Sequence, residues 1–424
     1  MELQNARGTR DFLPKEKIVR DEIRNTLVSM FERYGFSPLE TPLLERFEVL
    51  SSKYAGGEEI LKESFKLKDQ GSRDLGLRYD LTVPLSRVIG MNPQLKMPIK
   101  FYQIGQVFRD GPVSTARYRQ FTQCDVDIIG VKSMLAETDV LALAKDVFSA
   151  LNVEVIIRIN NRKVLNDLLH YCDIKKEHHE TVILSIDKLE KIGLSEVKKE
   201  LKQKKISEKA IHRIEEILSI TGTNKEKLSE IKKAIGETQG LQEIDELLQH
   251  LESIHVEIVF DHSLARGLSY YTGTVFEVNS KDNIVASAIS AGGRYDDMIG
   301  SLLGRGEYPA VGISFGLDRL FDVLINVKTP NKVVVTKLYI IPIQETTEAL
   351  KILSFFRQNG ICADMDFSGR GPSKNLDFAH AQKIPYVLFV GKKELEHGKV
   401  KLRDMISGNE ELLPKEEVLK KLQE

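Results

Sequence analysis

Residues 100–130 read KFYQIGQVFRDGPVSTARYRQFTQCDVDIIG, and this stretch decides the fold. Residues 101–108 are rich in aromatic and β-branched side chains, which predicts a strand. Residues 121–129 alternate between polar and apolar side chains, which predicts a second strand. Asp110-Gly111-Pro112 between them is typical of a loop. We therefore expect two strands joined by a loop.

The second strand is expected to have one polar and one apolar face. A period of two puts Gln123, Asp125 and Asp127 on the same face, while the residues between them can face a core. Three guanidinium groups are close in sequence: Arg109, Arg117 and Arg119. Amides and carboxylates beside guanidiniums suit a zwitterionic or phosphorylated ligand. The alternative is an ordinary antiparallel sheet with one face in water.

Length and composition predict a large globular protein. The 424 residues allow roughly two to four domains. The 42% hydrophobic and 29% charged content supports a sizeable core. A net charge of −1 neither supports nor excludes a nucleic-acid partner, which requires local basic patches. The three cysteines are far apart in sequence, which excludes a disulfide framework or a zinc motif and is typical of a reducing cytosol. The polar N-terminus and the lack of a long apolar run predict neither a signal peptide nor a membrane helix.

The N-terminal part is expected to contain a helix followed by short strands. The phrase ARGTRDFLP at 6–14 precedes apolar residues that recur at helical spacing from Val19 to Tyr34. Residues 36–45, FSPLETPLLE, contain two prolines, which favour an edge or terminal strand. A further strand is predicted at 63–68.

Residues 77–84, LRYDLTVP, lead into a helix predicted from about Val83. Asp80 and Thr82 stand where a helix cap would stand, and capping is one interpretation of them. The other is a binding site for an ammonium group, since a carboxylate and a hydroxyl are the acceptors that such a group needs.

The middle of the chain is expected to be mostly helical. A helix is predicted over 133–151 and a strand over 153–159. Residues 164–254 are rich in Lys and Glu and read as short amphipathic helices. The basic clusters at 198–199 and 202–205 have acids interspersed, which favours a solvated charged face. His178-His179 has no third ligand at useful spacing, so we expect no metal site there.

Two later stretches combine glycines with residues that bear on ligand chemistry. Residues 264–278 read LARGLSYYTGTVFEV, and residues 291–296 read AGGRYD. Glycine pairs serve turns or a close approach of the backbone to a ligand. Residues 310–320, AVGISFGLDRL, predict a strand that runs into a helix.

The C-terminal part is predicted to be a separate α/β unit. Residues 326–336 form a polar linker. Strands at 337–343, 362–366 and 387–391 then alternate with helices from Thr346 and Lys374. About 90 residues is a plausible size for one small domain.

These stretches, in this order, resemble the signatures of the histidyl-tRNA synthetases, a family of class II aminoacyl-tRNA synthetases. FR…RYRQFTQCDVDIIG resembles motif 2 of that class, and residues 36–45 resemble motif 1, which forms the homodimer interface. Residues 310–320 resemble motif 3. RGLSYYTG is similar to a signature restricted to this family.

The resemblance implies an α+β catalytic domain, built as the class II antiparallel sheet flanked by helices, over residues 1–325. It also implies a helical insertion at about 164–254 that resembles a clamp over the tRNA acceptor arm. A linker at 326–336 and a C-terminal α/β anticodon-binding domain at 337–424 complete the expected organisation. The implied protein is a cytoplasmic homodimer.

The implied activity is that of a histidine-tRNA ligase. Histidine and ATP would give histidyl-adenylate and pyrophosphate, and histidine would then pass to the 3′ end of tRNA(His). The catalytic residues implied are Arg109 and Arg266. The histidine-binding residues implied are Asp80, Leu81, Thr82, Arg109, Gln123, Asp127, Arg266, Tyr270 and Tyr271. The ATP-binding residues implied are Arg109, Arg117, Phe121 and Arg319. Mg²⁺ is implied with ATP, without a protein ligand that we can assign.

The chemistry expected of this site follows from charge. The histidine carboxylate attacks the α-phosphorus, and both are anionic, so Arg109 and Arg266 would neutralise the phosphate as rigid donor forks. No general base is needed because the nucleophile is already ionised. Phe121 would stack on adenine, and Arg319 would hold the far phosphate.

Two positions depart from the family pattern. Other members have Glu-Gly-Thr where this chain has Asp80-Leu81-Thr82, and both forms supply an acid and a hydroxyl. Motif 2 usually reads Arg-x-Glu, whereas this chain reads Arg109-Asp110-Gly111. Asp110 is one place too early to take the role of that glutamate.

Two other interpretations remain open at this point. The first is a non-catalytic regulatory subunit of ATP phosphoribosyltransferase, a class that resembles the synthetase core but tends to lack the anticodon domain and the arginine–tyrosine signature. The second is a synthetase of the same subclass for another amino acid, which R-G-L-x-Y-Y disfavours. The chain contains neither a G-x-x-x-x-G-K-[ST] loop nor a G-x-G-x-x-G turn, which disfavours parallel-sheet nucleotide folds.

Overall fold

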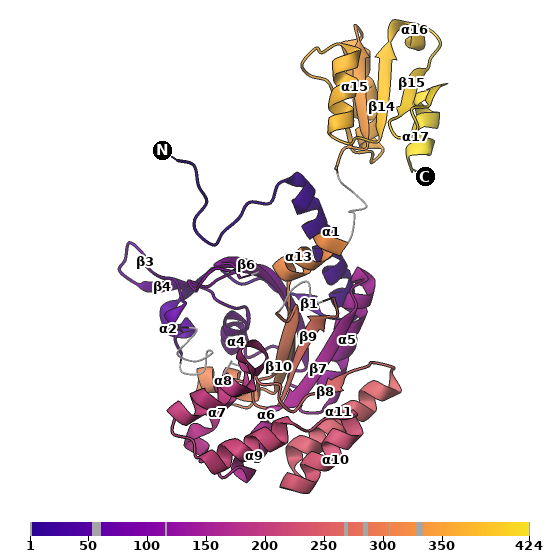
Figure 1. Cartoon of the computed structure of the whole chain (residues 1–424). Helices are drawn as coiled ribbons and strands as arrows, with labels where there is room; N and C mark the ends of the chain where they lie inside the picture. The colour runs from indigo at the N-terminus through magenta and orange to yellow at the C-terminus, as the bar shows by residue number, and fades with distance from the viewer. Residues whose placement is uncertain are drawn as a thin grey trace. The chain divides into compact units, whose positions relative to one another are not determined.

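The computed structural model describes residues 2–52, 61–114, 117–266, 270–282, 287–304, 306–327 and 334–423. They form two compact units, Met1–Asp11 with Glu22–Val327 and Phe12–Asp21 with Lys328–Glu424 (Figure 1). Residues 267–269 of the RGLSYYTG stretch and most of the predicted linker, residues 328–333, lie outside the described residues.

The first unit is organised around a large sheet that, within the described residues, has eight strands in the order β1-β5-β6-β11-β10-β9-β7-β8. Their bounds are Ser37–Pro38, Ile99–Phe108, Gln120–Ile129, Ala310–Gly316, Ser290–Arg294, Thr274–Ser280, Val155–Asn161 and Val259–Phe260. Pairing is parallel at the two edges, β1 with β5 and β7 with β8, and antiparallel between. The expected antiparallel sheet flanked by helices is confirmed.

A small sheet lies beside it, with strands in the order β2 (Leu44–Arg46), β4 (Asp74–Leu77) and β3 (Lys66–Lys68). The strand predicted at 63–68 is therefore shorter than expected. A turn in which the Ser64 N–H donates to the Leu61 carbonyl precedes it, so Glu63 and Ser64 do not join the ladder. The proline-containing stretch 36–45 supplies β1 at a sheet edge, as its prolines predict.

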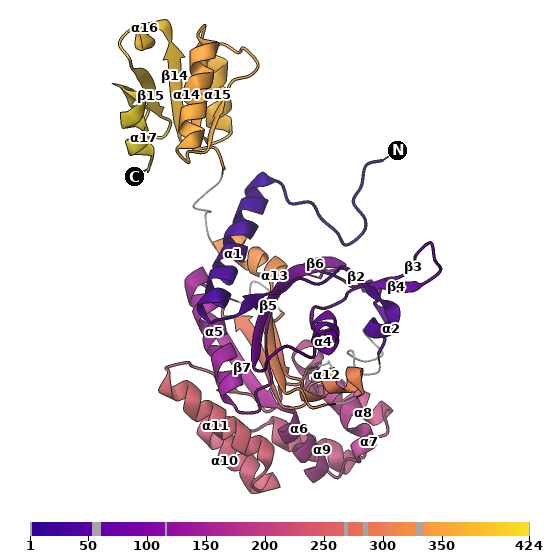
Figure 2. The ribbon, with the colours of Figure 1, turned by 180° about the vertical axis from the view of Figure 1, so that it is seen from behind.

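Helices cover both faces of the large sheet. The helices of this layered core are α1 (Pro14–Arg33), α2 (Phe47–Leu50), α4 (Thr82–Met91), α5 (Leu135–Leu151), α12 (Asp296–Leu303) and α13 (Leu317–Val327). Figure 2 shows α4 and α5 on opposite sides of the sheet. On the α5 side, Phe315 of β11 packs between Phe31 of α1 and Phe148 of α5, with ring centroids 5.6 and 5.8 Å away. The apolar faces of β6 and β11 are therefore buried, and their polar faces look toward α4.

The predicted helical insertion lies between β7 and β8. It consists of α6 (Arg162–Tyr171), α7 (Lys176–Ile186), α8 (Leu189–Gln203), α9 (Glu208–Leu218), α10 (Asn224–Ile235) and α11 (Gln239–Ser253). Each helix buries at least one apolar side chain, and Thr223 with Glu226 forms a capping box at the start of α10.

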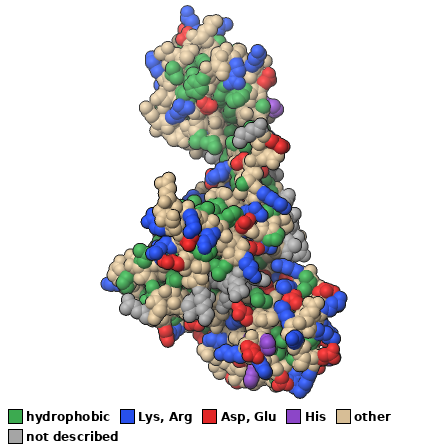
Figure 3. Space-filling view, turned by 90° about the vertical axis from the view of Figure 1, so that its left-hand side faces the viewer, with side chains coloured by type: hydrophobic (Ala, Val, Ile, Leu, Met, Phe, Trp, Pro, Cys, Tyr) green, Lys and Arg blue, Asp and Glu red, His purple; other side chains and the backbone are tan. Residues whose placement is uncertain are grey.

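The basic clusters of the insertion are paired with acids, as expected of a solvated charged face. Lys198 contacts Glu215 at 2.7 Å, and Lys204 contacts Glu200 at 2.6 Å. Figure 3 shows Lys and Arg interspersed with Asp and Glu over the lower part of the view. His179 is likewise occupied by protein partners, the Asn166 side chain at 3.2 Å and the Ile174 carbonyl at 3.0 Å.

The second unit is a sheet with five strands among the described residues, ordered β13-β12-β14-β15-β16. Their bounds are Ala363–Met365, Leu338–Ile343, Tyr386–Gly391, Val400–Asp404 and Glu410–Leu413. The helices are α14 (Thr346–Gln358), α15 (Pro372–Ala381), α16 (Lys392–Leu395) and α17 (Lys415–Gln423). The three predicted strands are confirmed and pair in parallel, while the antiparallel β15 and β16 are additional. The helix predicted from Lys374 begins at Pro372, because proline suits the first helical position.

Alternation along β12 explains the packing of this unit. Leu338 and Ile340 join the core that α14 and α17 cover. Tyr339 and Ile341 point to the other face and pack with Ala379 of α15. A strand that is apolar on both faces is typical of a central strand between two helical layers.

Candidate active site

The polar face of β6 continues across β11 and β10. Asp127 is paired with Gly312, which is paired with Gly293, and Asp125 is paired with Ser314. Residues opposite each other in an antiparallel ladder share a face, so the carboxylates stand beside a floor of very small side chains. A Cβ at Gly312 would lie 2.0 Å from Asp127 Oδ1, so a larger residue would displace that carboxylate. The glycine at position 312 is therefore what leaves room for the Asp127 carboxylate on this face.

Asp127 is buried and held by a tyrosine. Tyr295, which directly precedes α12, donates its hydroxyl proton to Asp127 Oδ1 at 2.5 Å. Asp127 is only 4% exposed, and burial raises the pKa of its carboxyl to about 7, although the Tyr295 hydrogen bond acts in the opposite direction. Hydrogen-bond donors near Asp127 therefore favour its charged carboxylate form, which burial disfavours.

Two acceptor oxygens on this face have no hydrogen-bond partner among the described residues: Asp125 Oδ1 and Gln123 Oε1. Gln123 is oriented by donating from Nε2 to Ser314 Oγ at 2.8 Å. Burial and the charge of Asp127 raise the pKa of Asp125 well above its usual value. Buried acceptors without partners carry a desolvation cost that a ligand with N–H groups would relieve.

The position of Asp80 is compatible with both interpretations of residues 77–84, helix capping and ligand binding. Its Oδ1 accepts the Val83 N–H at 3.1 Å at the start of α4, as a capping residue would. It is also buried, and burial raises the pKa of its carboxyl to about 6, although the Val83 N–H and the Arg109 guanidinium lower it. Asp80 in turn raises the pKa of Asp127. It therefore caps the helix and faces the same polar region.

The neighbours of Asp80 differ in exposure. Leu81 is 1% exposed, and its carbonyl accepts a hydrogen bond from Gln103 Nε2 at 3.1 Å. Thr82 is half-buried at the first position of α4. The side chain of Thr82 is thus more accessible than that of Leu81.

Arg109 follows β5 and lies between Phe121 and Asp80. Its Nε donates to the Tyr79 carbonyl at 3.1 Å, and its guanidinium stands 5.2 Å from the centre of the Phe121 ring. Burial lowers the pKa of Arg109, while the Asp80 carboxylate and the Tyr270 hydroxyl raise it. An arginine in this state still carries its charge.

The arginine–tyrosine segment before β9 reaches the same region. Arg266 forms an ion pair with Glu277 of β9, and its Nε has no hydrogen-bond partner among the described residues. Burial opposes the charge, but Tyr271 and Glu277 raise the pKa of Arg266 above its usual value. The Tyr270 ring lies 4.8 Å from that of Tyr271 and 6.1 Å from that of Tyr295. Tyr270 therefore lies between Tyr271, which neighbours Arg266, and Tyr295, which is hydrogen-bonded to Asp127.

Arg319 of α13 completes the set of guanidiniums. Its Nη1 donates to the Ala288 carbonyl at 2.5 Å. Burial lowers the pKa of Arg319, and the positive charges of Arg109, Arg266 and Arg117 lower it further. Four arginines from three parts of the chain, the β5–β6 loop, the segment before β9 and α13, are thus within electrostatic range of one another.

The arginines of the β5–β6 loop have different roles. Arg117 is about half-exposed, and its Nη2 contacts Glu63 Oε1 at 2.6 Å. Arg119 contacts Asp110 at 3.1 Å, and its N–H donates to the Gly8 carbonyl at 2.8 Å. Arg119 therefore stabilises the loop and is separate from the polar row on β6.

The sequence did not indicate a site role for three residues of this region: Glu63, Glu277 and Ser314. Ser314 alternates with Gly312 and Gly316 in β11, a run of small residues that could have indicated an open face. Tyr295 lies in the stretch AGGRYD, whose pair Gly292-Gly293 indicated a turn or a close approach of the backbone to a ligand. Glu63 and Glu277 carried no local signal, because their partners are distant in sequence.

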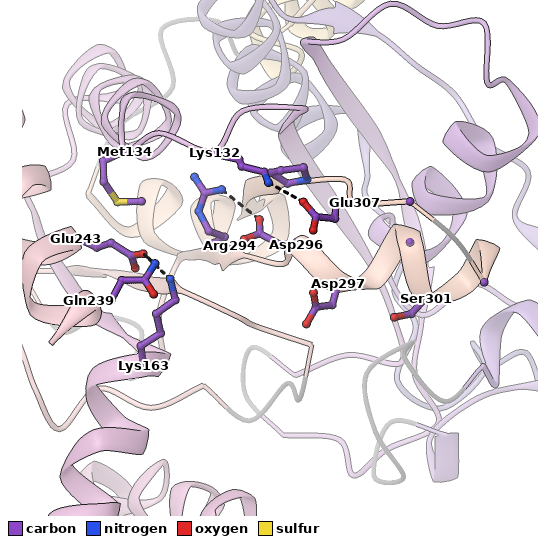
Figure 4. Close-up of a pocket in the computed structure, with 14 residues that line it drawn as sticks. Lys132, Met134, Lys163, Gln239, Glu243, Arg294, Asp296, Asp297, Ser301 and Glu307 are labelled. Atoms are coloured by element: carbon purple, nitrogen blue, oxygen red, sulfur yellow. Dashed lines mark hydrogen bonds and ion pairs between the residues drawn. The ribbon is translucent and has the colours of Figure 1, made fainter.

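A cavity of about 600 Å³ elsewhere in the first unit is a competing location (Figure 4). Its charged side chains are mostly neutralised by one another: Lys132 with Glu307 at 2.6 Å, Lys163 with Glu243, and Arg294 with Asp296 at 3.1 Å. Arg294 and Asp296 of the AGGRYD stretch line it, but none of the histidine- or ATP-binding residues implied by the resemblance does. We therefore place the candidate site on the polar face of β6 and β11.

Within the described part of the chain, no three His, Cys, Asp or Glu side chains are arranged to hold a metal ion. In the same residues, no helix is both long and apolar enough to cross a lipid bilayer.

Two family models match the chain in succession. The model described as histidyl-tRNA synthetase matches residues 8–320, and the one described as anticodon binding domain matches residues 337–424. Together they account for both compact units.

Relatives and solved structures agree. A histidine–tRNA ligase 1 from Bacillus cereus is 42% identical over 421 residues, which covers 98% of each chain. The crystal structure of a histidyl-tRNA synthetase from Nostoc sp. PCC 7120 is 29% identical, with a TM-score of 0.87, and the match covers 100% of this chain and 99% of that one. A structure titled ATP phosphoribosyltransferase regulatory subunit/histidyl-tRNA synthetase, from Bacillus halodurans C, has a TM-score of 0.77 at 22% identity and covers 92% of this chain and 98% of that one. That last likeness shows the fold alone.

Proposed function

The chain belongs to the histidyl-tRNA synthetase family of class II aminoacyl-tRNA synthetases, and we propose that it activates L-histidine with ATP and transfers it to the 3′ end of tRNA(His). The observation that carries this proposal is that Arg109 lies close enough to the buried carboxylates of Asp80 and Asp125 to lower their pKa values, while Arg319 lies within electrostatic range of both Arg109 and Arg266. The regulatory-subunit alternative is not favoured, because curated relatives over nearly the whole chain are histidine–tRNA ligases.

Histidine would bind over the small-residue floor of the sheet. Its ammonium group would be held by Asp80 and Thr82, with Gln123 as a further acceptor. Its imidazole N–H would donate to Asp127, beside Tyr270 and Tyr271. The raised pKa values of Asp80 and Asp127 support this arrangement, since a bound cation or N–H donor stabilises the carboxylate form that burial disfavours.

ATP would lie along the arginines. Phe121 would stack on adenine, with Arg117 near the phosphates, and Arg319 would hold the far phosphate. Arg109 and Arg266 would approach the α-phosphate. Phe121 is only partly buried, so one face of its ring can accept a base beside the guanidinium that it already contacts.

The reaction then follows from charge neutralisation. A histidine carboxylate oxygen forms a bond to the α-phosphorus, and the bond from that phosphorus to the bridging oxygen breaks. Pyrophosphate leaves with the electron pair. Arg109 and Arg266 stabilise the negative charge that accumulates in between, a contribution of about 3–4 kcal/mol for each well-placed donor.

Mg²⁺ would accompany ATP and neutralise its phosphates. The described residues offer no three-ligand cage, and Mg²⁺ is commonly held by substrate phosphates and water with one or two carboxylates. The donor set of this site fits that mode of binding.

We propose that the chain is divided by role. Residues 1–325 catalyse both steps, and the insertion at about 164–254 contacts the tRNA acceptor arm. Residues 326–336 link this part to residues 337–424, which bind the anticodon. The protein is further proposed to be a cytoplasmic homodimer with its interface at residues 36–45.

Pyrophosphate exchange with each of the twenty amino acids tests the activity. Exchange that depends on histidine alone, followed by charging of tRNA(His), is the expected result. A folded protein that exchanges with no amino acid would favour the regulatory-subunit alternative. Exchange with another amino acid would overturn the assignment of histidine.

A further inference from the structure

The departure at the third position of motif 2 has a structural counterpart. Gly111 is buried, and a Cβ built on it would lie 2.6, 2.7 and 2.8 Å from Oε1, Cδ and Oε2 of Glu63. The carboxylate of Glu63 therefore occupies the space in which a side chain of residue 111 would begin. Glycine at this position is what admits it.

The backbone holds Glu63 in this place. The Asp110 N–H donates to the Glu63 carbonyl at 2.6 Å, which ties residue 63 to the loop that follows β5. This bond fixes the backbone of residue 63 beside the loop, so the position of the Glu63 carboxylate next to Gly111 follows from the backbone as well as from the side-chain rotamer.

The Glu63 carboxylate stands among the arginines assigned to ATP. Oε1 of Glu63 accepts from Arg117 Nη2 at 2.6 Å, and the Glu63 side chain is 27% exposed. Its charge also raises the pKa of Arg109, whereas Arg117 lowers it. Glu63 thus offsets the repulsion between two guanidiniums that must approach the same nucleotide.

We propose that Glu63 supplies, from outside motif 2, the carboxylate that the motif ordinarily carries at the position of Gly111, and that it positions Arg117 for ATP. This inference rests on the proposed function. Arg117 has a long side chain whose rotamer freedom must be lost when it binds a phosphate. A carboxylate that already fixes the guanidinium pre-orders it, so the benefit appears in the binding of ATP and not in that of histidine.

The competing interpretation is an ordinary ion pair at the protein surface. Such pairs contribute little to stability, and removing one changes no ligand affinity. The two interpretations differ in what Glu63→Gln does, because glutamine keeps the shape and removes the charge.

The experiment measures KM for ATP and for histidine in histidine-dependent pyrophosphate exchange. The variants are Glu63→Gln, Glu63→Ala and the exchange variant Glu63→Ala/Gly111→Glu, which moves the carboxylate back to residue 111. Glu307→Gln is the matched control, since it removes a 2.6 Å ion pair with Lys132 at a more exposed position. Circular dichroism and thermal unfolding establish that each variant is folded.

We expect Glu63→Gln to raise KM for ATP by about tenfold, the effect of losing one charge-assisted hydrogen bond, and to leave KM for histidine within about twofold. The exchange variant is expected to recover ATP binding that Glu63→Ala has lost, and Glu307→Gln to behave as the unaltered protein. An unchanged KM for ATP in folded Glu63→Gln overturns the proposal, as does an equal rise in both KM values. Failure of the exchange variant to improve on Glu63→Ala shows that the two positions are not equivalent and also overturns it. Failure of the proposed function is distinguishable, because the unaltered chain would then show no histidine-dependent exchange.

Discussion

Tyr295 donates its hydroxyl proton to Asp127 across 2.5 Å, and both side chains are buried. The tyrosine precedes α12, whereas the aspartate stands on β6, so the contact joins residues that are 168 positions apart. Oδ1 of Asp127 is thus hydrogen-bonded within the protein, and the predictions below concern the contact that the carboxylate makes with a ligand.

Asp127→Asn is predicted to weaken histidine binding by about 10–100-fold, the effect of a hydrogen bond to a charged group. Asparagine keeps the size of the side chain and removes the charge that an imidazole N–H would contact. ATP binding should change little. Calorimetric titration with each ligand checks this, and unchanged histidine affinity in the folded variant would end the assignment.

The same carboxylate should also select against phenylalanine. A phenyl ring offers no N–H, so binding it would leave Asp127 buried without its ligand partner, and such sites reject the wrong substrate by about 10⁴–10⁵-fold. The ratio of kcat/KM for histidine to that for phenylalanine should fall sharply in Asp127→Asn. A ratio equal to that of the unaltered protein would contradict this role.

Asp127 should make the stability of the ligand-free protein fall with rising pH. Its pKa is raised from 3.8 to about 7 in the folded state. Between about pH 4 and 7 the folded protein therefore holds a proton that the unfolded chain has released, and the free energy of unfolding decreases as pH rises through this window. Asp80, whose pKa is raised to about 6, acts in the same direction.

Thermal unfolding at about pH 5, 6.5 and 8 measures this effect. Relative to the unaltered protein, Asp127→Asn should gain stability as pH rises, by roughly 1.4 kcal/mol per unit of pKa difference. Tyr295→Phe is the matched variant, because it removes the hydrogen bond that lowers the pKa of Asp127 and should extend the window upward. A stability difference between Asp127→Asn and the unaltered protein that is constant across pH would refute the raised pKa.

Arg266→Ala is predicted to abolish adenylate formation while histidine binding largely survives, because the guanidinium serves the phosphate. A loss of about 3–4 kcal/mol in transition-state stabilisation is expected. Pyrophosphate exchange measures the loss, and calorimetry measures histidine affinity. Near-normal exchange would show that Arg266 is not catalytic.

Gly312→Ala is predicted to damage histidine binding without unfolding the protein. The added methyl group would lie 2.0 Å from Asp127 Oδ1 and 2.8 Å from the Val126 carbonyl, so the carboxylate must move. Gly371→Ala is the control, since no atom lies within 4 Å of its Cβ position. Equal histidine affinity in the two variants would show that the position of Asp127 is unimportant.

A chain that ends at Val327 is predicted to make histidyl-adenylate and to charge tRNA poorly. The residues of the candidate site all precede Val327, and the second unit has its own core of two packed clusters. Exchange and charging assays on this truncation separate the two steps. Equal loss of both in a folded truncation would refute the proposed division of labour.

Much of the fold was determined by local patterns in the sequence. Alternation along 121–129 indicated a strand with one polar face. The prolines of the stretch 36–45 indicated that residues 37–38 lie at the edge of a sheet, and they lie at an edge of the large sheet. The strands β12, β13 and β14 of the second unit were predictable because apolar runs alternate with helical segments, whereas the structure established their parallel pairing. Such signals need only the neighbouring residues. The hairpin β15–β16 was missed because its strands carry many charges, and their pairing and the apolar cover supplied by α17 are tertiary.

The site was only partly determined in this way. Residue types and their order in the chain indicated Arg109, Asp127, Arg266 and Arg319, and the resemblance to a family supplied their expected roles. The place of the Asp127 carboxylate depended on strand register, because Gly312 leaves space for Asp127 only when the two are directly opposite. The raised pKa values are likewise tertiary, since burial causes them.

Glu63 shows most clearly what the sequence alone does not determine about the site. Its sequence neighbourhood contains no sign of a binding role, and Gly111 alone reads as a turn residue. Only folding brings the carboxylate of one into the space left by the missing side chain of the other. A contact between residues 48 positions apart in sequence depends on the path of the whole chain between them, and no local pattern records that path.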